Sequence, residues 1–282
     1  MQTGTLYIVA TPIGNLEDIT LRALRVLKEV SLIAAEDTRV TRKLLSHYDI
    51  HTPQTAYHQH SRGRRAEEII ERLKAGDDVA LVSDAGTPGI SDPGHELIAF
   101  AIEEGISIIS VPGPNALITA LVVSGLPTAH FAFDGFPPRK ESERRAFFRG
   151  LKNDPRTLVL YESPMRTLAT LKSALAELGD RRAAIVREAT KVFEEIFRGT
   201  LSQAIERFTL PKPRGEITIV IEGAGPEETY NTPESIEQRL RALIADGMSE
   251  RDAIRQAAAE LKLPRREVYA AALRIKSEKQ TP

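Results

Sequence analysis

The 282-residue chain contains no cysteine. It therefore forms no disulfide and uses no thiolate in catalysis. It also lacks a run of about 18 apolar residues, so we expect no membrane span. Its first residues show no basic segment followed by an apolar one, and no secretory signal is expected. These absences fit a cytoplasmic protein.

The chain also lacks an excess of positive or of negative charge. The chain has 38 Lys and Arg against 39 Asp and Glu, a formal net charge of −1. This balance gives no global attraction to nucleic acid, so any surface that binds RNA has to be a local patch. With 41% hydrophobic and 27% charged residues, the composition is that of an ordinary globular protein long enough for two domains.

Short apolar runs alternate with helical patterns over most of the chain. Such runs predict buried strands at 6–10, 31–35, 78–82, 107–111, 131–136, 157–161, 183–186, 193–198 and 216–221. Periodic apolar residues predict helices at 19–30, 39–48, 66–75, 95–104, 116–124, 168–178 and 201–208. Strands that alternate with helices predict an α/β fold.

The stretch from Ser83 to Gly94 is the densest in turn-forming residues. Residues 86–94 include three Gly and two Pro, which forbid a helix or a strand ladder there. A rigid loop with few side chains at the carboxyl end of a strand is where open α/β sheets bind ligands. The alternative is a tight strand-to-helix turn capped by Asp92.

Two other predicted strands end in similar turns. They are Thr11-Pro12-Ile13-Gly14 and Pro112-Gly113-Pro114-Asn115. On one edge of one sheet, the three turns would form a single cleft. The first turn lacks the glycine and lysine spacing of a phosphate-binding Walker loop, which excludes that motif.

Charged and imidazole side chains follow other predicted strands. Glu36-Asp37-Thr38-Arg39 comes directly after a strand, where either a functional role or helix capping explains it. His58 and His60 stand alone, without nearby cysteine or carboxylate ligands, so we predict no metal site.

The Pro137-Pro138 pair and the polar stretch to Arg149 predict a domain joint. We therefore expect an N-terminal α/β domain at 1–136 and a second α/β domain at 137–228. Basic residues dominate the joint: Arg139, Lys140, Arg144, Arg145, Arg149 and Lys152. They form either a solvated helix face or an RNA contact.

The end of the chain changes character. Residues 223–232 have the composition of a linker, and from Pro233 the pattern is helical, which predicts a small helical domain at 233–282. Ser249 begins a capping box with Asp252. Two helices before a basic one resemble a helix-turn-helix, but three-helix packing is equally consistent. In the first case Arg265 and Arg266 would contact RNA.

Six motifs, in register, resemble one family. They are Val9-Ala10-Thr11-Pro12-Ile13-Gly14-Asn15-Leu16, Ala35-Glu36-Asp37-Thr38-Arg39, Ser83-Asp84-Ala85-Gly86-Thr87-Pro88, Pro112-Gly113-Pro114-Asn115-Ala116, Tyr161-Glu162-Ser163-Pro164 and Arg187-Glu188-Ala189-Thr190-Lys191. Together they resemble the tetrapyrrole methylase superfamily, and within it the branch that methylates a ribose 2′-hydroxyl on small-subunit ribosomal RNA.

The resemblance implies two α/β domains with S-adenosylmethionine in the cleft between them, followed by the helical domain. It implies methylation of a cytidine ribose in small-subunit ribosomal RNA, either free or in the assembled subunit, by a homodimer. The residues implied to hold the cofactor are Gly86, Thr87, Ile90, Asn115, Ala116, Tyr161, Ala189 and Gly215. Relatives that act on small molecules often have Gly-Asp-Pro where this chain has Gly86-Thr87-Pro88. Residue 87 of this chain therefore offers the cofactor no carboxylate, and Asp84 is expected to take over part of that contact.

A ribose hydroxyl is a poor nucleophile until its proton is removed, so a general base within hydrogen-bond reach is expected. The candidates at strand ends are Glu36, Asp37, Glu188 and Lys191, of which we favour Glu188 or Lys191 as the catalytic residue. A lysine acts as a base only if its pKa is depressed. Alternatively, Arg187, Glu188 and Lys191 form ion pairs that brace the domain interface. Arg39 and Arg166 are expected on RNA phosphate.

Two other functions stay open. One is methylation of a small tetrapyrrole-like metabolite. The other is a ribosome-assembly factor that binds RNA without catalysis. The basic joint and the helical end favour an RNA substrate, because an enzyme acting on a small molecule needs neither.

Overall fold

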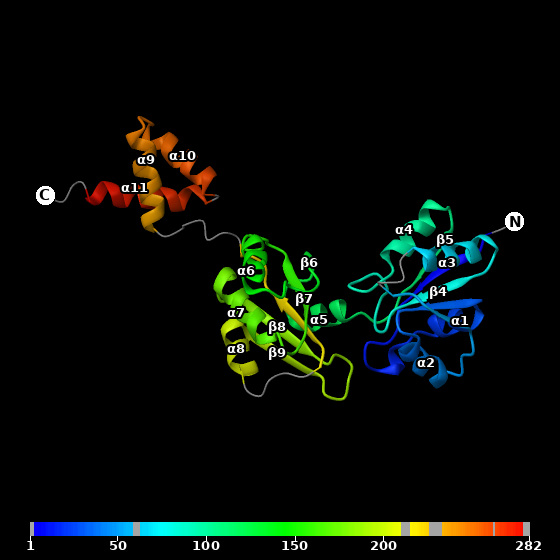
Figure 1. Cartoon of the computed structure of the whole chain (residues 1–282). Coiled ribbons are helices and arrows are strands. Elements are labelled where there is room, and N and C mark those ends of the chain that lie inside the picture. Colours follow the sequence, from blue (N-terminus) through cyan, green and yellow to red (C-terminus); the bar gives the residue numbers. More distant parts are fainter. Residues whose placement is uncertain (1–2, 59–62, 210–214, 226–232, 262, 279–282) are drawn as a thin grey trace. The chain divides into compact units, whose positions relative to one another are not determined.

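The computed structural model describes residues 3–58, 63–209, 215–225, 233–261 and 263–278 (Figure 1). The chain divides into two compact units. One contains residues 1–152 and 156–223, and the other contains residues 153–155 and 224–282. The first unit holds two β-sheets and the second holds three helices, each with a hydrophobic core of its own.

The first sheet is parallel. Its strands are β1 (Thr5–Val9), β2 (Leu32–Ala35), β3 (Gln54–Ala56), β4 (Val79–Val82) and β5 (Ser107–Val111). Their order across the sheet is β3-β2-β4-β1-β5. The connecting elements are the 3₁₀ turn η1 (Leu16–Asp18) and the helices α1 (Leu21–Glu29), α2 (Thr38–His47), α3 (Arg64–Lys74) and α4 (His95–Glu103).

Helices cover both faces of this sheet, and so its strands read as unbroken apolar runs. In β1, Leu6 and Ile8 pack into the core shared with α3 and α4. Val9 points to the opposite face, into the core shared with α1 and α2. The same alternation holds in β2 and β4. The edge strand β3 was not predicted, because Gln54-Thr55-Ala56 is half-buried and carries no apolar run.

The carboxyl ends of the parallel strands meet at one edge, and the Gly- and Pro-rich turns meet there too. Thr11, after β1, and Gly86, after β4, exchange two backbone hydrogen bonds of 2.9 Å each. The turn after β5 lies equally close: a Cβ placed on Gly113 would lie 3.0 Å from the Ala10 Cβ. The predicted gathering of the three turns on one edge is confirmed.

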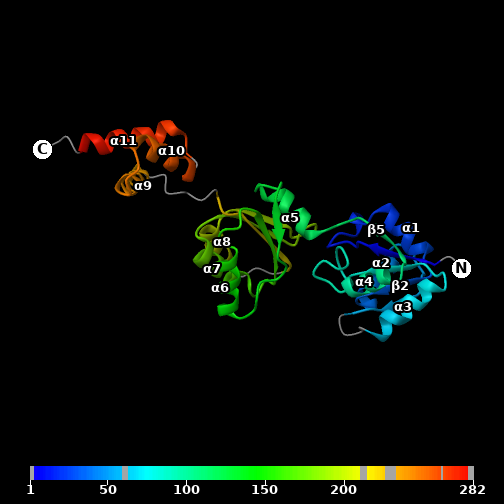
Figure 2. The same ribbon diagram turned by 90° about the horizontal axis from the view of Figure 1, so that it is seen from above.

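The second sheet is mixed. Its strands are β6 (Phe131–Phe133), β7 (Thr157–Glu162), β8 (Arg182–Arg187), β9 (Glu195–Thr200) and β10 (Ile217–Ile221), in the order β6-β7-β10-β8-β9. Only β6 and β7 run parallel; the other neighbours are antiparallel. The helices of this half are α5 (Ala116–Ser124), α6 (Glu141–Gly150), α7 (Thr167–Leu178) and α8 (Leu201–Thr209) (Figure 2).

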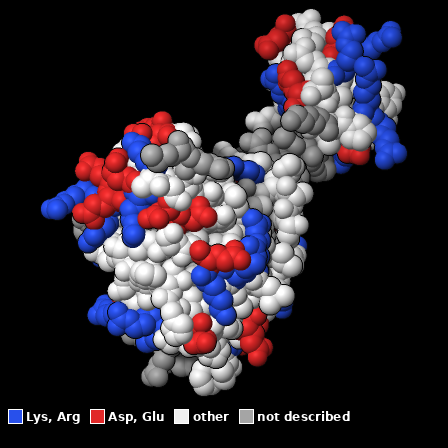
Figure 3. All heavy atoms as spheres, turned by 90° about the vertical axis from the view of Figure 1, so that its right-hand side faces the viewer, with Lys and Arg blue, Asp and Glu red and all other residues white. Residues whose placement is uncertain are grey.

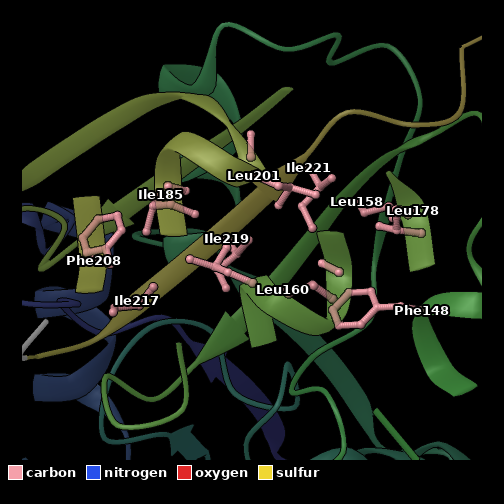
Figure 4. Close-up of a cluster of buried hydrophobic side chains, with 14 of the residues drawn as sticks. Phe148, Leu158, Leu160, Leu178, Ile185, Leu201, Phe208, Ile217, Ile219 and Ile221 are labelled. Atoms are coloured by element: carbon pink, nitrogen blue, oxygen red, sulfur yellow. The ribbon is translucent and has the colours of Figure 1, made fainter. Parts of the chain in front are cut away.

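Both faces of the second sheet are also covered by helices, one face by a single helix and the other by three. Helix α5 packs on one face, where Leu117 and Leu121 contact Val159 and Val220. Helices α6, α7 and α8 cover the other, and Figure 4 shows side chains from these helices and from β7, β8 and β10 filling that core. The strands alternate between the two cores, as buried strands do.

The boundary between the two sheets lies earlier than the predicted residue 136. Strand β6 pairs with β7, and helix α5 packs on β8 and β10, so both belong to the second sheet. The chain leaves the first sheet after β5. The proline pair Pro137-Pro138 ends β6 and leads into α6; it does not join domains. The first unit ends at Gly223, and the predicted limit at residue 228 lies outside the described residues.

The second unit consists of α9 (Pro233–Ala245), α10 (Glu250–Glu260) and α11 (Arg265–Glu278), and confirms the predicted helical domain. Leu240, Ala257 and Val268, one from each helix, are buried in a common core. Ser249 caps α10 by accepting a hydrogen bond of 3.2 Å from the backbone N–H of Asp252. None of the helices in the described part of the chain is long and apolar enough to cross a membrane.

Candidate functional site

A cavity of about 330 Å³ opens at the carboxyl edge of the first sheet, and residues from both sheets line it. The first half of the chain provides its wall through the turns after β1, β4 and β5. The second half provides the ends of β7 and β8 and the start of β10. The lining residues are Ile13, Ala85, Gly86, Thr87, Ile90, Ser91, Asp92, Asn115, Ala116, Phe136, Tyr161, Glu162, Ser163, Pro164, Val186, Ala189, Gly215, Glu216, Ile217 and Thr218.

The structure brings together eight of the nine residues predicted to hold a cofactor. These are Gly86, Thr87, Ile90, Asn115, Ala116, Tyr161, Ala189 and Gly215, all of which line the cavity. They come from five separate segments of the chain, so their convergence is a property of the fold.

Asn115 connects the loop after β4 to helix α5. Its side-chain amide donates a hydrogen bond of 3.2 Å to the Thr87 hydroxyl. Its side-chain oxygen caps α5 by accepting from the backbone N–H of Ile118, at 3.4 Å. Gly86 sits in the left-handed region, with φ 79°, which a side chain adopts only at a cost. The cavity wall on this side is therefore built mainly from backbone and short polar groups.

Tyr161 holds the opposite wall. Its hydroxyl oxygen accepts a hydrogen bond of 3.1 Å from the backbone N–H of Leu117 in the first turn of α5. Its ring lies 4.8 Å from that of Phe133 and 5.7 Å from that of Phe136, measured between centroids. Burial raises the pKa of Tyr161. The phenol therefore keeps its proton and can donate it in a second hydrogen bond.

Asp84, the ninth of these residues, does not line the cavity, and its contact to the cofactor stays a prediction. It is exposed, and its carboxylate accepts a hydrogen bond of 3.0 Å from the backbone N–H of Asp37. The backbone N–H of Asp84 in turn donates to Glu36, at 3.3 Å. These bonds connect the loop after β4 to the loop after β2, so this acidic group serves as a junction between loops.

Asp92 is the carboxylate that the sequence analysis missed as a site residue. The interpretation as a helix cap is wrong, because the cap position of α4 is Gly94 and no side chain caps that end. Asp92 lines the cavity instead. Burial, followed by the negative charge of Glu36, raises its pKa to about 7, against a hydrogen bond from Ser83 that acts in the opposite direction. Its position after Ser91 in the dense Gly and Pro loop was the available signal.

Glu188 and Lys191 form an ion pair with a bond length of 2.9 Å. Lys191 also pairs with Glu216 at 3.2 Å. Burial acts to lower the pKa of Lys191, but the hydrogen bond that Lys191 donates to Glu188 and the negative charge of Glu216 outweigh it and raise the pKa. The depressed pKa that a lysine base needs is therefore absent.

The carboxylate of Glu188 has a bracing role. Besides Lys191, it accepts a hydrogen bond of 2.9 Å from the backbone N–H of Glu216. These bonds outweigh burial and lower the pKa of Glu188, which weakens it as a base. The geometry favours the alternative in which Glu188 and Lys191 form an ion pair. Arg187 is not part of that pair, because it binds Glu195 at 3.0 Å. Glu188 has φ 52°, a strained conformation of the kind found at functional sites.

Two of the predicted RNA-binding arginines bind polar groups of the protein itself. Arg144 is buried and donates hydrogen bonds to the Ser173 hydroxyl at 3.0 Å and to the Arg139 carbonyl at 2.9 Å. Arg166 pairs with Glu162 at 3.2 Å and donates to the Pro137 carbonyl. The burial of Arg144 argues against its predicted RNA contact, whereas the contact of the half-buried Arg166 stays a prediction.

The buried Glu162 is another lining residue that sequence analysis did not single out. It accepts hydrogen bonds from the Thr170 hydroxyl at 2.5 Å and from the backbone N–H of Ser163 at 2.8 Å. Its lone pairs are therefore committed to the protein. The motif Tyr161-Glu162-Ser163-Pro164 was recognised, but nothing in it indicated which members face the cavity.

The other basic residues remain on the surface. Arg139 and Lys140 are exposed, and exposed Arg39 pairs with Asp37 at 2.6 Å, which together with hydrogen bonding lowers the pKa of Asp37 to about 2. Arg145 and Arg149 share the carboxylate of Glu177. Figure 3 shows basic and acidic side chains interspersed over one face of the molecule, as the net charge predicts.

The helical unit has a cationic hollow of its own. Arg265 and Arg266 are exposed and line a hollow of about 740 Å³ together with Arg251, Arg255 and Tyr269. Four guanidinium groups beside an exposed phenol ring suit contacts to phosphate and to bases. Of the two histidines excluded as metal ligands, His60 lies outside the described residues.

Comparison with known proteins gives a consistent set of relatives. The family model of the tetrapyrrole (corrin/porphyrin) methylases matches residues 5–205. A protein of Synechocystis sp. named ribosomal RNA small subunit methyltransferase I is 49% identical over 98% of this chain and 99% of its own length. The protein of the same name from Halalkalibacterium halodurans is 48% identical over 94% of this chain and 93% of its length. That from Thermotoga maritima is 50% identical, and 99% of its length aligns with 78% of this chain.

Solved structures agree with the fold. Uroporphyrin-III-C-methyltransferase from Thermus thermophilus is similar with a TM-score of 0.55 at 22% identity, over 77% of this chain and 94% of that one. Cobalt precorrin-4 methyltransferase is similar with a TM-score of 0.57 at 20% identity, over the same shares. The two-sheet fold, the length of the family match and the full-length relatives together place the chain in the tetrapyrrole (corrin/porphyrin) methylase family.

Proposed function

We propose that this protein methylates the ribose 2′-hydroxyl of a cytidine in small-subunit ribosomal RNA, with S-adenosylmethionine as the methyl donor. The observation that carries the proposal is the cavity in which eight residues, predicted from the motifs of this family branch, meet from both sheets. The relatives named ribosomal RNA small subunit methyltransferase I supply the substrate class. A related structure is of a protein complexed with S-adenosylhomocysteine.

The chemistry of the cavity fits such a donor. Ile13, Ile90 and Val186 provide apolar surface for a purine ring, while Asn115 and Tyr161 provide hydrogen-bonding groups. S-adenosylmethionine supplies a methyl group on a cationic sulfonium. A cavity with the Asp92 carboxylate and no lining lysine or arginine among the described residues suits a cation.

The residues of the cavity contribute mainly by orientation. Methyl transfer in line requires that the nucleophile approach the methyl carbon to about 3 Å, with water excluded. The backbone of the Gly86 loop and the α5 start, fixed by the bond between Asn115 and Thr87, gives a rigid wall for this purpose.

Surface arginines and lysines are proposed to hold the RNA. In the first unit these are Arg39, Arg139 and Lys140, all exposed. In the helical unit they are Arg265 and Arg266, at the cationic hollow. Such contacts to phosphate position an RNA without reading its sequence, and they weaken as the salt concentration rises.

Mass spectrometry of nucleosides tests the proposal. The protein is incubated with labelled S-adenosylmethionine and small-subunit ribosomal RNA, either free or in the assembled subunit. The expected product is a labelled 2′-O-methylcytidine. A label on a porphyrinoid metabolite would support the small-molecule alternative, and RNA binding without any transfer would support the assembly factor.

Two further properties belong to the proposal. The protein acts in the cytoplasm, which suits a chain without cysteine and a ribosomal substrate. It acts as a homodimer, as the resemblance to two-domain members of the family implies. Sedimentation equilibrium at micromolar concentration should give twice the 31.1 kDa mass of the chain, and a monomer mass would refute this assembly.

A further inference from the structure

Asp92 belongs to two hollows at once. It lines the cavity described above, and it also lines a smaller hollow of about 110 Å³, together with Tyr57, His58 and His95. Asp92 is therefore shared by the linings of both spaces. A group in that position can contact a molecule on either side.

The loop around Asp92 has an unusual backbone. Ser91 has φ 61°, a left-handed conformation that a residue other than glycine adopts at a cost. Two residues after Asp92, Gly94 has φ 143°, and a Cβ there would lie 3.0 Å from the Leu81 side chain. Between them Pro93 has a fixed φ.

The charges that face Asp92 come from several elements. Carboxylates of Glu36 after β2, Asp84 after β4 and Glu216 before β10 all act on it. His58, His95 and Glu96 lie on the side of the smaller hollow. Burial and these negative charges raise the pKa of Asp92 to about 7, so near neutral pH it exchanges a proton readily.

Several other carboxylates of the region are less suited to take a proton. Glu188 is ionised by its bonds to Lys191 and to the backbone of Glu216. Glu162 is committed to Thr170 and Ser163. The carboxylates that connect the loops after β2 and β4 do not line the cavity.

We propose that Asp92 is the general base that accepts the proton of the ribose 2′-hydroxyl, with the methyl donor in the larger cavity and the ribose in the smaller hollow beside Tyr57, His58 and His95. The inference rests on the proposed function. The bond between the ribose oxygen and the methyl carbon forms as the bond between that carbon and sulfur breaks. The electron pair of the broken bond stays on sulfur, and the hydroxyl proton passes to an Asp92 carboxylate oxygen.

Asp92→Asn tests the inference, because it keeps the size of the side chain and removes its basicity. The turnover number should fall by about 10²- to 10⁴-fold, the usual contribution of a general base. The affinity for S-adenosylhomocysteine, measured by calorimetry, should change little, because its sulfur is uncharged. Glu103→Gln, which removes an exposed carboxylate from the other end of α4, is the matched control and should leave both quantities as they are.

The pH profile separates a base from a merely structural carboxylate. In the wild type, kcat/KM should rise with pH through a midpoint near 7, where Asp92 loses its proton. Asp92→Asn should abolish this rise, and Glu103→Gln should retain it. Wild-type turnover in Asp92→Asn, or an equal loss of affinity for S-adenosylhomocysteine, would overturn the assignment.

Stability gives a readout that does not depend on activity. Because the folded state raises the pKa of Asp92 above its unfolded value, ionisation disfavours folding as the pH rises through about 7. Relative to the wild type, the Tm of Asp92→Asn should therefore be higher at pH 8 to 9 than at pH 5. A difference in Tm that does not vary with pH would contradict the buried, titrating carboxyl that the assignment needs.

The outcomes also distinguish this inference from the proposed function. If the wild type transfers no methyl group to ribosomal RNA, both fail. If the wild type is active and Asp92→Asn is equally active, only the inference fails. If Asp92→Asn does not fold, the ¹³C shift of the Asp92 carboxyl in the wild type decides: titration near pH 7 supports the assignment, and titration near pH 4 overturns it.

Discussion

Glu188 and Gly215 show how single residues shape the second wall of the cavity. Glu188 turns its carboxylate onto the backbone of the segment that enters β10. A Cβ on Gly215 would lie 2.2 Å from that carboxylate, and Gly215 has φ 83°. Glycine is required there on both counts, because a side chain would meet the carboxylate and would strain the backbone.

Gly215→Ala should therefore lower the free energy of unfolding by more than the cost of placing alanine at a positive φ. We expect ~1 kcal/mol from the backbone conformation and about 1–3 kcal/mol more from the collision with Glu188. Urea unfolding measures the difference. Gly105→Ala is the control, because Gly105 has φ 69° and open space around it. Equal losses in the two variants would contradict a packing role for Gly215.

Lys191 offers a second test at the scale of the residue. Its aliphatic stem crosses Gly14, where a Cβ would lie 2.3 Å from the Lys191 Cγ, and its ammonium contacts two carboxylates. Because its pKa is raised, it stays protonated through the neutral range. Its contribution is then a positive charge that fixes the loop after β8.

Lys191→Arg should consequently retain most of the methyl transfer, since arginine keeps the charge, while Lys191→Met should lose both stability and activity. Initial rates with a labelled donor measure the transfer. A fall of about 10²- to 10⁴-fold in Lys191→Arg, the loss expected for a missing general base, would restore lysine as the catalytic residue.

At the scale of elements, the loop from Val82 to Gly94 organises the site. Its Gly86 forms two backbone hydrogen bonds with Thr11, and its Thr87 hydroxyl accepts a hydrogen bond from the Asn115 side chain. Its Asp92 lines the cavity. Its prolines fix φ, its glycines adopt the positive φ that the turns require, and short side chains let a ligand approach the backbone.

Bulk at Gly86 should close this loop on the cavity. In Gly86→Leu, the new side chain extends toward Ile13, which a Cβ would already approach to 3.5 Å. The affinity for S-adenosylhomocysteine, measured by calorimetry, should fall below detection. Gly125→Leu is the control, because Gly125 has φ 74° with open space and does not line this cavity. Binding at full affinity by folded Gly86→Leu would refute the placement of the donor.

At the scale of the whole molecule, the helical unit is separable by its packing. Leu240, Ala257 and Val268 belong to a core that holds no residue of the first unit. The Thermotoga maritima relative is nearly complete within 78% of this chain. A unit with a closed core of its own keeps its fold when a linker is cut.

Deletion of residues 233–282 should leave the affinity for S-adenosylhomocysteine nearly unchanged and weaken the use of RNA. The reason is that all residues lining the cavity lie in the first unit, whereas Arg265 and Arg266 are lost. Calorimetry and methylation rates at several RNA concentrations measure the two effects, with KM for RNA expected to rise. An equal loss of cofactor binding would show that the helical unit supports the site.

Local sequence determined most of the secondary structure and the existence of the site. Buried parallel strands must be apolar on both faces, and turns that approach a ligand must be rich in glycine and proline. These requirements are visible residue by residue, and so the turns and the cap at Ser249 could be predicted. The eight cavity residues were implied by the resemblance of the six motifs to the family.

Tertiary structure alone decided which groups meet. The assignment of β6 and α5 to the second sheet depends on pairing and packing across the chain, to which a proline pair gives no clue. The pKa of Asp92 depends on carboxylates that come from other strands, and the burial of Arg144 depends on α7. A basic or acidic letter in a sequence gives the charge of a side chain, but its surroundings set its proton affinity and its access to solvent.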